Sequence, residues 1–77
     1  MRLLVVEDDR EAANYLRKAF REAGHICEVA GDGEEGLALA LDEQFDVFVI
    51  DRMLPKRDGL SLISEIRKRG VATPVLI

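Results

Sequence analysis

Four acidic residues of this chain stand where strands are expected to end, and their side chains could act together. Glu7, Asp8 and Asp9 follow the apolar run 3–6, and Asp51 follows the apolar run 47–50. Short runs of this kind, rich in β-branched residues, are typical of strands that are buried on both faces. In open parallel sheets, ligands bind in the crevice beyond the carboxyl ends of the strands. The positions of these acids therefore make them candidates for a functional site.

Carboxylates that lie close together repel one another, so one of them tends to take up a proton unless a cation is present. Mg²⁺ prefers oxygen ligands and keeps several of its waters, and it would remove this repulsion. The same cation would allow Asp51 to attack a phosphoryl donor and form an aspartyl phosphate. Acids at strand ends also cap helices, which is the interpretation we favour for Asp9, while Asp32, Asp42 and Asp46 are expected in turns or at a strand start. Spacing alone leaves both interpretations of the cluster open.

The first half of the chain predicts two strands and two helices around these acids. Apolar residues at helical spacing predict a helix over residues 10–23, with Asp8 or Asp9 as its N-cap and Gly24 as its stop signal. The alternating stretch 25–29 predicts a half-exposed strand at a sheet edge. A turn over residues 30–33 leads into a second, short helix, whose apolar face is expected to hold Leu37, Ala40 and Leu41.

The second half predicts a strand over residues 47–50, a third helix after the proline loop, and a last strand over residues 75–77. The inner face of the third helix is expected to hold Leu60, Leu62, Ile63 and Ile66. Strands that alternate with helices pair in parallel, because helical crossovers join parallel strands in a right-handed sense. If the second crossover steps back past the first strand, the order is 2-1-3-4, and the acids at positions 7, 8 and 51 share one crevice.

Composition limits the classes of protein to consider. A chain of 77 residues is one domain at most, and 48% hydrophobic residues are typical of a globular protein. The formal charge of -4 argues against a nucleic-acid surface. The single cysteine, Cys27, is expected to be buried and reduced, as in a cytoplasmic protein. No apolar run approaches the roughly 20 residues that a membrane span needs.

Several motifs taken together resemble one family. They are LVVEDD at 4–9, GDGEE at 31–35, DRMLP at 51–55, DGL at 58–60 and TPV at 73–75. This set resembles the receiver domain of two-component response regulators, particularly the OmpR/PhoB type with a winged-helix DNA-binding output, and the resemblance covers the whole chain. It implies an α/β, flavodoxin-like (CheY-like), doubly wound parallel sheet.

The resemblance also implies roles for single residues. It implies that Asp51 is the phosphoacceptor, that Asp8 is a direct Mg²⁺ ligand, that the backbone carbonyl of Met53 is a further ligand, and that Glu7 acts through water. Its expected partner is a histidine kinase, docked largely on the first helix, where Tyr15 lies. DNA would be reached only through a separate output domain, no membrane is involved, and the receiver itself is not expected to be an enzyme.

The family pattern continues beyond residue 77, so we expect residues 1–77 to be the N-terminal part of a single receiver domain, truncated after the start of the fourth strand. The family's last helix-strand-helix is then missing, together with a hydroxyl residue after the fourth strand and a lysine on the fifth. We therefore expect an acceptor and its metal ligands without the output switch. Apolar surface left on the third and fourth strands is expected to make the chain self-associate.

Three alternatives compete with this interpretation. A phosphohydrolase of the haloacid-dehalogenase kind would need a second Asp two positions after Asp51, where this chain has Met53. A nucleotide-binding loop would need a longer glycine pattern and a lysine after residues 31–33. The third alternative is a structural fragment that cannot signal because it is incomplete.

Overall fold

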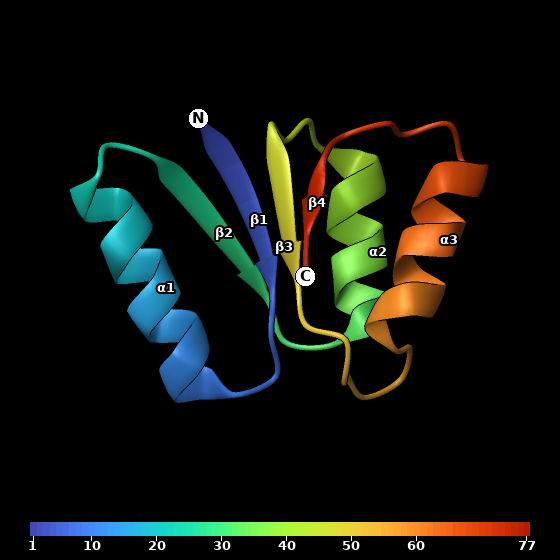
Figure 1. Cartoon of the computed structure of the whole chain (residues 1–77), viewed down its shortest axis with the longest axis horizontal. Helices are drawn as coiled ribbons and strands as arrows, with labels where there is room; N and C mark the ends of the chain where they lie inside the picture. The colour runs from blue at the N-terminus through green and yellow to red at the C-terminus, as the bar shows by residue number, and fades with distance from the viewer.

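The computed structural model describes residues 1–77, in which four strands and three helices alternate along the chain. The strands are β1 (Arg2–Val6), β2 (Ile26–Ala30), β3 (Val47–Ile50) and β4 (Val75–Leu76), and the helices are α1 (Arg10–Glu22), α2 (Gly33–Asp42) and α3 (Gly59–Lys68). All four strands run in the same direction, and the loops that follow β1, β2 and β3 gather at one edge of the sheet (Figure 1).

The sheet is parallel, with the order β2-β1-β3-β4, which confirms the predicted strand order. Val6 lies opposite Ala30 of β2 on one side and opposite Ile50 of β3 on the other. The edge position predicted for the second strand is also confirmed, because β2 pairs only with β1. The two central strands therefore end side by side, and the residues that follow them leave the sheet together.

The helices cover the two faces of the sheet unequally. α2 and α3 lie next to each other on one face, where the main core joins Leu4, Phe48 and Ile50 to Leu62 and Ile66. α1 contacts β1 and β2 on the other face. Residues of β1 alternate between these faces, as side chains on a strand must, and all four from Leu3 to Val6 are buried.

Two predicted core positions are wrong. Leu60 is 50% exposed and Leu41 is 37% exposed. On a helix, residues four apart share a face, so Leu62 and Ile66 point into the core together. Leu60 precedes Leu62 by two positions and therefore lies on the opposite side of α3. Leu41 similarly lies one step around α2 from Ala40, which is buried.

An aspartate side chain caps the N-terminus of each of the three helices. All three helices start at the edge of the sheet where the strands that precede them end. Asp9 caps α1 by accepting from the Glu11 amide at 3.0 Å, and Asp58 caps α3 by accepting from the Ser61 amide at 2.9 Å. Asp32 caps α2. Gly24, with φ of +90°, follows α1 in the left-handed region, as its predicted role as a stop signal requires.

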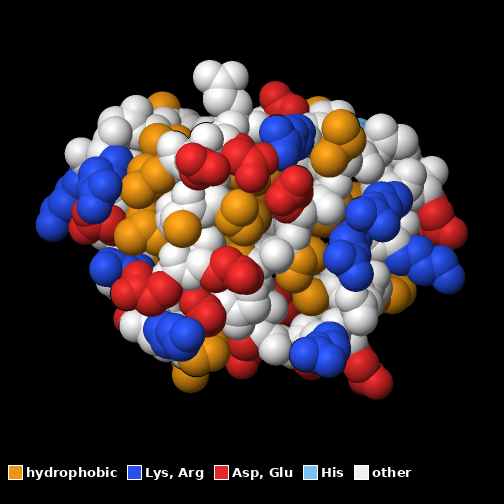
Figure 2. Space-filling view, turned by 180° about the vertical axis from the view of Figure 1, so that it is seen from behind, with side chains coloured by type: hydrophobic (Ala, Val, Ile, Leu, Met, Phe, Trp, Pro, Cys, Tyr) orange, Lys and Arg blue, Asp and Glu red, His pale blue; other side chains and the backbone are white.

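Three further features of the structure bear on the functional classes considered above. Cys27 is buried, with a free thiol, as predicted. Acidic and basic side chains are interspersed on the face seen in Figure 2, with apolar side chains between them, so this face carries no continuous positive patch. None of the three helices combines the length and the apolar character that crossing a bilayer requires.

Candidate acidic site at the sheet edge

Three carboxylates converge where β1 and β3 end. The Asp51 amide donates to the Val6 carbonyl at 3.0 Å, and the Glu7 amide donates to the Ala30 carbonyl at 3.0 Å, so pairing of the strands continues one residue beyond each strand. One carboxylate oxygen from each of Glu7, Asp8 and Asp51 lies within 4.8 Å of the other two. The structure thus brings together the three acids for which the sequence predicted a shared crevice.

The electrostatics of the cluster are those of like charges held close together. Partial burial raises the pKa of the Glu7 carboxyl group, and the neighbouring Asp51 and Asp8 charges raise it further. A hydrogen bond from the Asp9 amide to Glu7 Oε2, at 3.1 Å, acts in the opposite direction. Glu7 and Asp51 are half-buried and Asp8 is exposed, so the cluster is open to solvent on one side.

The segment after Asp51 folds back over its carboxylate. The Met53 amide donates to Asp51 Oδ1 at 3.2 Å, and the Gly59 amide donates to the Arg52 carbonyl at 2.9 Å. A Cβ atom at Gly59 would lie 2.2 Å from the Asp51 carbonyl oxygen, so only glycine fits at this start of α3. The Met53 side chain itself is 80% exposed.

The donor set of the cluster suits a hard cation. Its side chains offer only carboxylate oxygens, without a thiolate or an imidazole, and this is the chemistry that Mg²⁺ and Ca²⁺ prefer. A hollow of about 180 Å³ borders Glu7 and Asp51 and is otherwise lined mostly by apolar side chains. The arrangement could hold a small cation and leave a carboxylate oxygen of Asp51 accessible to a second ligand.

The other acids weighed in the sequence do not join this cluster. Asp9 caps α1, as predicted, and Asp32 caps α2. Asp42 is the last residue of α2. Asp46 precedes β3, and its Oδ2 atom accepts from the Arg2 amide at 2.6 Å.

Sequence reasoning missed a set of residues on the loop between β3 and α3. Pro55 accepts a hydrogen bond from the Gly33 amide, Lys56 forms an ion pair with Asp32, and Arg57 forms one with Glu34. The GDGEE motif by itself predicts a turn and a helix start, without a contact to this loop. The available signal for these ion pairs was opposite charge. Lys56 and Arg57 follow a proline, and the GDGEE motif contains three acidic residues.

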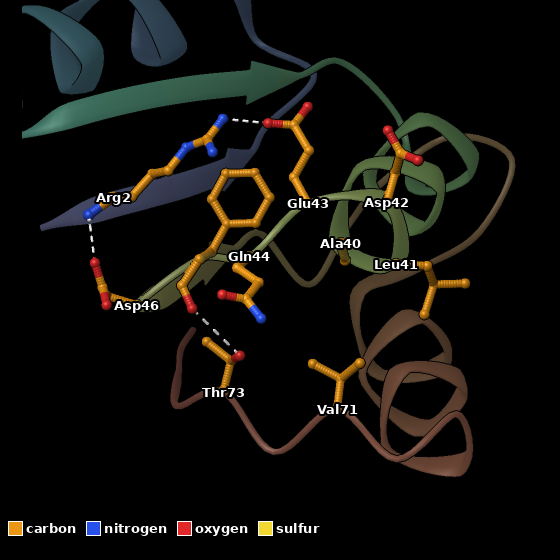
Figure 3. A pocket seen from close by; sticks show the side chains of 10 residues that line it. Arg2, Ala40, Leu41, Asp42, Glu43, Gln44, Asp46, Val71 and Thr73 are labelled. Atoms are coloured by element: carbon orange, nitrogen blue, oxygen red, sulfur yellow. Dashed lines mark hydrogen bonds and ion pairs between the residues drawn. The ribbon is translucent and has the colours of Figure 1, made fainter.

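A larger hollow, of about 820 Å³, lies at the opposite edge of the sheet (Figure 3). Arg2, the basic residue that lines it, is already engaged, since it bonds to Glu43 of the lining and to Glu28 of β2 and lies 5.1 Å from the centroid of the Phe45 ring. Thr73 Oγ1 donates to the Phe45 carbonyl at 3.4 Å. These contacts hold the amino ends of the strands together, far from the acidic cluster in the fold.

Solved structures of known proteins match this fold closely. The receiver domain of the Francisella response regulator 1452 superposes with a TM-score of 0.94 at 42% identity, over 96% of this chain and 61% of that one. The response regulator TrrA of Thermotoga maritima, solved in complex with Mg²⁺-BeF, gives a TM-score of 0.84 at 32% identity, over 88% of this chain and 59% of that one. The flavodoxin-like, CheY-like fold is therefore confirmed.

Curated relatives agree with the structural match. The transcriptional regulatory protein DltR of Streptococcus agalactiae is 40% identical over 76 residues, and the transcriptional activator protein IrlR of Burkholderia pseudomallei is 43% identical over 76 residues. Each alignment covers 99% of this chain but only 34% and 33% of the relative, so the chain spans about a third of their length. The family model described as the response regulator receiver domain matches residues 3–77. This chain belongs to the response regulator receiver domain family.

Proposed function

We propose that this chain accepts a phosphoryl group on Asp51, as the receiver domain of a two-component response regulator, in a reaction that depends on Mg²⁺. The observation that carries the proposal is the convergence of Glu7, Asp8 and Asp51, whose carboxylate oxygens lie within 4.8 Å of one another. Acids that served only as helix caps would not need to converge from two strands. Asp9, which is a cap, lies outside the cluster.

The residues present fit a bound Mg²⁺ ion. Asp8, Asp51 and the backbone carbonyl of Met53 would hold it directly, and Glu7 would contact it through water. When bound, Mg²⁺ neutralises the negative charge that would otherwise keep a phosphoryl donor away from the carboxylates. The similar regulator TrrA was solved in complex with Mg²⁺-BeF, which supports Mg²⁺ as the cation.

Asp51 would act as a nucleophile towards a phosphohistidine of the kinase. A carboxylate oxygen forms a new O–P bond while the N–P bond of the donor breaks, and the imidazole nitrogen keeps the electron pair of that bond and takes a proton. The Met53 amide, which donates to Asp51 Oδ1, leaves Oδ2 as the freer oxygen for this attack. Asp51 is consumed in the step, so the chain is a substrate of its kinase and, we infer, no enzyme in its own right.

The partners follow from the same assignment. The proposed kinase surface is α1, on which Tyr15 is 74% exposed and Lys18 is exposed. The relatives DltR and IrlR are a transcriptional regulatory protein and a transcriptional activator. We infer that the parent protein acts on DNA through an output domain outside these residues and that it works in the cytoplasm, where a free thiol such as Cys27 stays reduced.

Exposed apolar residues on β4 favour contact between copies of this chain. Leu76, at the end of this edge strand, is 62% exposed, and Ile77, which follows the strand, is 69% exposed. Open edges with apolar side chains tend to find partners. Light scattering at high micromolar concentration tests this inference, which a monomer at every concentration would refute.

Incubation with acetyl phosphate and Mg²⁺, followed by intact-mass spectrometry, tests the proposed function. We expect one phosphoryl adduct, which disappears in Asp51→Asn and when Mg²⁺ is chelated. Asp58→Asn is the matched control, because it removes a carboxylate from the same loop while asparagine can still cap α3. A wild-type chain that binds Mg²⁺ but gains no adduct would instead support the alternative of a fragment that cannot signal.

A further inference from the structure

The loop between β3 and α3, residues 52–58, is fixed to the start of α2 by backbone contacts. The Pro55 carbonyl accepts from the Gly33 amide at 3.2 Å and from the Arg57 amide at 2.7 Å. A Cβ atom at Gly33 would lie 2.0 Å from the Arg57 carbonyl oxygen, so the two backbones are in direct contact. Lys56 has φ of +68°, and it is the only residue other than glycine with a positive φ. Lysine rarely adopts this conformation, so neighbouring contacts must hold it.

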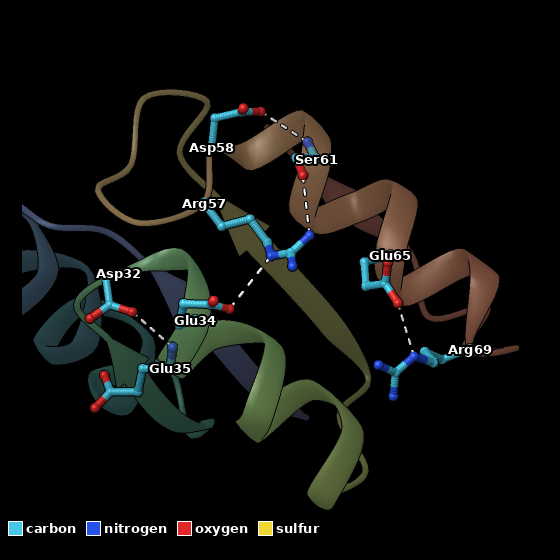
Figure 4. Close-up of polar contacts among 8 residues, drawn as sticks. All are labelled: Asp32, Glu34, Glu35, Arg57, Asp58, Ser61, Glu65 and Arg69. Carbon is cyan, nitrogen blue, oxygen red and sulfur yellow. Dashed lines mark hydrogen bonds and ion pairs between the residues drawn. The ribbon is translucent and has the colours of Figure 1, made fainter.

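Two ion pairs join the same loop to the same helix start. Lys56 Nζ lies 3.5 Å from Asp32 Oδ2, and Arg57 Nε lies 3.6 Å from Glu34 Oε2. The guanidinium of Arg57 also donates to Ser61 Oγ at 3.2 Å, so it links α2 to α3, as Figure 4 shows. The Arg57 side chain is 29% exposed, which means that most of it packs between these two helices.

The platform to which the loop is fixed is itself rigid. Asp32 accepts from the Glu35 amide at 2.8 Å, and Glu35 Oε1 accepts from the Gly31 amide at 2.8 Å, so side chains and backbone fix the first turn of α2 in both directions. The hydrogen bond from Glu35 and the nearby Lys56 charge hold the pKa of Asp32 below its usual value, so Asp32 stays ionised as a partner of Lys56.

The other end of the loop lies in the acidic site. Met53, two positions before Pro55, donates through its amide to Asp51 Oδ1. The Gly59 amide closes the loop on the Arg52 carbonyl at 2.9 Å. Only one residue separates Met53 from Pro55 in this seven-residue loop, so we expect a shift of Pro55 or Arg57 to be passed on to Met53.

From this arrangement we propose that Arg57 and Glu34 are positioning residues for the acidic site. Their ion pair, with the Lys56–Asp32 pair beside it, holds loop 52–58 on α2 and so fixes Met53 beside the Asp51 carboxylate. The inference rests on the proposed Mg²⁺ site for its functional readout. Its structural half concerns the loop in the metal-free protein and can be tested separately.

A neutral double variant, Glu34→Gln with Arg57→Gln, separates positioning from simple charge. It removes one charge of each sign, so the net charge near the site is unchanged and a pure charge effect predicts unchanged Mg²⁺ affinity. Positioning predicts weaker binding by about twofold to fivefold, which corresponds to a partly exposed ion pair worth up to about 1 kcal/mol. The charge-swapped variant, Glu34→Arg with Arg57→Glu, is expected to recover most of the affinity.

The matched control is the ion pair at the C-terminal end of α3, in which Nε of Arg69, the C-cap residue, lies 2.9 Å from Glu65 Oε2. Figure 4 shows this pair further along the helix, away from the loop. Glu65→Gln with Arg69→Gln also preserves net charge, and we expect it to leave the Mg²⁺ affinity, measured by calorimetry, unchanged. A control variant that weakens Mg²⁺ binding as much as the Glu34 and Arg57 variant would overturn the proposal.

Amide hydrogen exchange in the metal-free protein, measured by NMR, gives the second readout. We expect faster exchange at Gly33 and Met53 in the neutral Glu34 and Arg57 variant, and unchanged exchange in the α3 control. Amide exchange and Mg²⁺ affinity that stay at wild-type values in the neutral variant would overturn the proposal. A charge-swapped variant that binds Mg²⁺ no more tightly than the neutral variant would also overturn it. If the wild-type chain binds no Mg²⁺, the proposed function fails, and exchange at these two amides still decides whether the ion pair holds the loop.

Discussion

The Asp51 amide donates a hydrogen bond to the Val6 carbonyl at 3.0 Å. This bond continues the pairing in which Val6 lies opposite Ile50, so the residues after β1 and β3 leave the sheet together. The closeness of the carboxylates of Glu7 and Asp51 is therefore a consequence of strand pairing in the centre of the sheet. Their mutual repulsion is built into the folded state and is absent from the unfolded chain.

The free energy of unfolding of the metal-free protein should consequently fall as the pH rises through the range in which Glu7 loses its proton. Burial and the Asp51 charge raise the pKa of Glu7 above its ordinary value of 4.5, so the native state binds more protons than the unfolded state between those two pKa values. The free energy of unfolding therefore decreases with rising pH through that window. We expect Glu7→Gln to remove this decrease and to be more stable than wild type at neutral pH. Urea unfolding at a series of pH values without divalent cations measures the free energy of unfolding of both proteins. Identical pH profiles for the wild type and Glu7→Gln would contradict the prediction.

Asp8 and Asp9 are neighbours in the sequence, but substitutions at the two positions should have opposite effects. Asp8→Asn removes a carboxylate of the cluster, so we expect Mg²⁺ affinity to fall by about tenfold or more while metal-free stability is unchanged or higher. Asp9→Ala removes the N-cap of α1 and should cost about 1 kcal/mol of unfolding free energy while most of the Mg²⁺ affinity remains. Calorimetric titration and urea unfolding of both variants measure the two quantities. Equal losses of affinity would show that Asp9 also belongs to the site.

The strands and the acids at their ends could be predicted from the sequence because they depend on simple patterns, whereas the order 2-1-3-4 followed only on the condition that the second crossover steps back past the first strand. Apolar runs such as 3–6 mark buried strands, and the acids follow directly after them. The side of a short helix on which each apolar residue lies was harder to predict. Leu60 and Leu62 are equally apolar and lie on opposite sides of α3, and the tertiary packing of the helix places Leu62 in the core.

The contacts of loop 52–58 were hard to predict for a different reason. The loop meets the start of α2 only after the sheet has brought residues 33 and 57 together, and the sequence contains no periodic signal for such a contact. Gly33 was understood as a turn residue, whereas the structure shows that its missing side chain makes room for the Arg57 carbonyl. Asp32 was placed in a turn and is in fact the cap of α2.

The close approach at Gly59 gives a steric prediction. A Cβ atom there would meet the Asp51 carbonyl oxygen at 2.2 Å and the Arg52 Cα atom at 2.8 Å, and backbone atoms cannot move aside as a flexible side chain can. We expect Gly59→Ala to cost about 1–3 kcal/mol of unfolding free energy and to weaken Mg²⁺ binding, because the loop must shift. Gly31→Ala is the matched control, since nothing lies within 4 Å of a Cβ atom at that position. Equal stability of the two variants in urea unfolding would contradict the predicted clash.

Leu60 and Leu62 provide the same substitution in two environments on one helix. Leu62 is fully buried among the residues of the main core, and Leu60 is 50% exposed. Leu62→Ala should cost about 2–5 kcal/mol, because it loses buried apolar area and leaves a cavity. Leu60→Ala should change stability by no more than about 0.5 kcal/mol, because alanine favours the helix and little buried area is lost. The loss at Leu62 would be a large share of the roughly 5–15 kcal/mol that stabilises a typical domain, so circular dichroism should accompany urea unfolding to detect a chain that no longer folds. Similar losses for the two variants would mean that α3 packs on the sheet through a different face, and the position of its N-terminal loop beside Asp51 would then also be wrong.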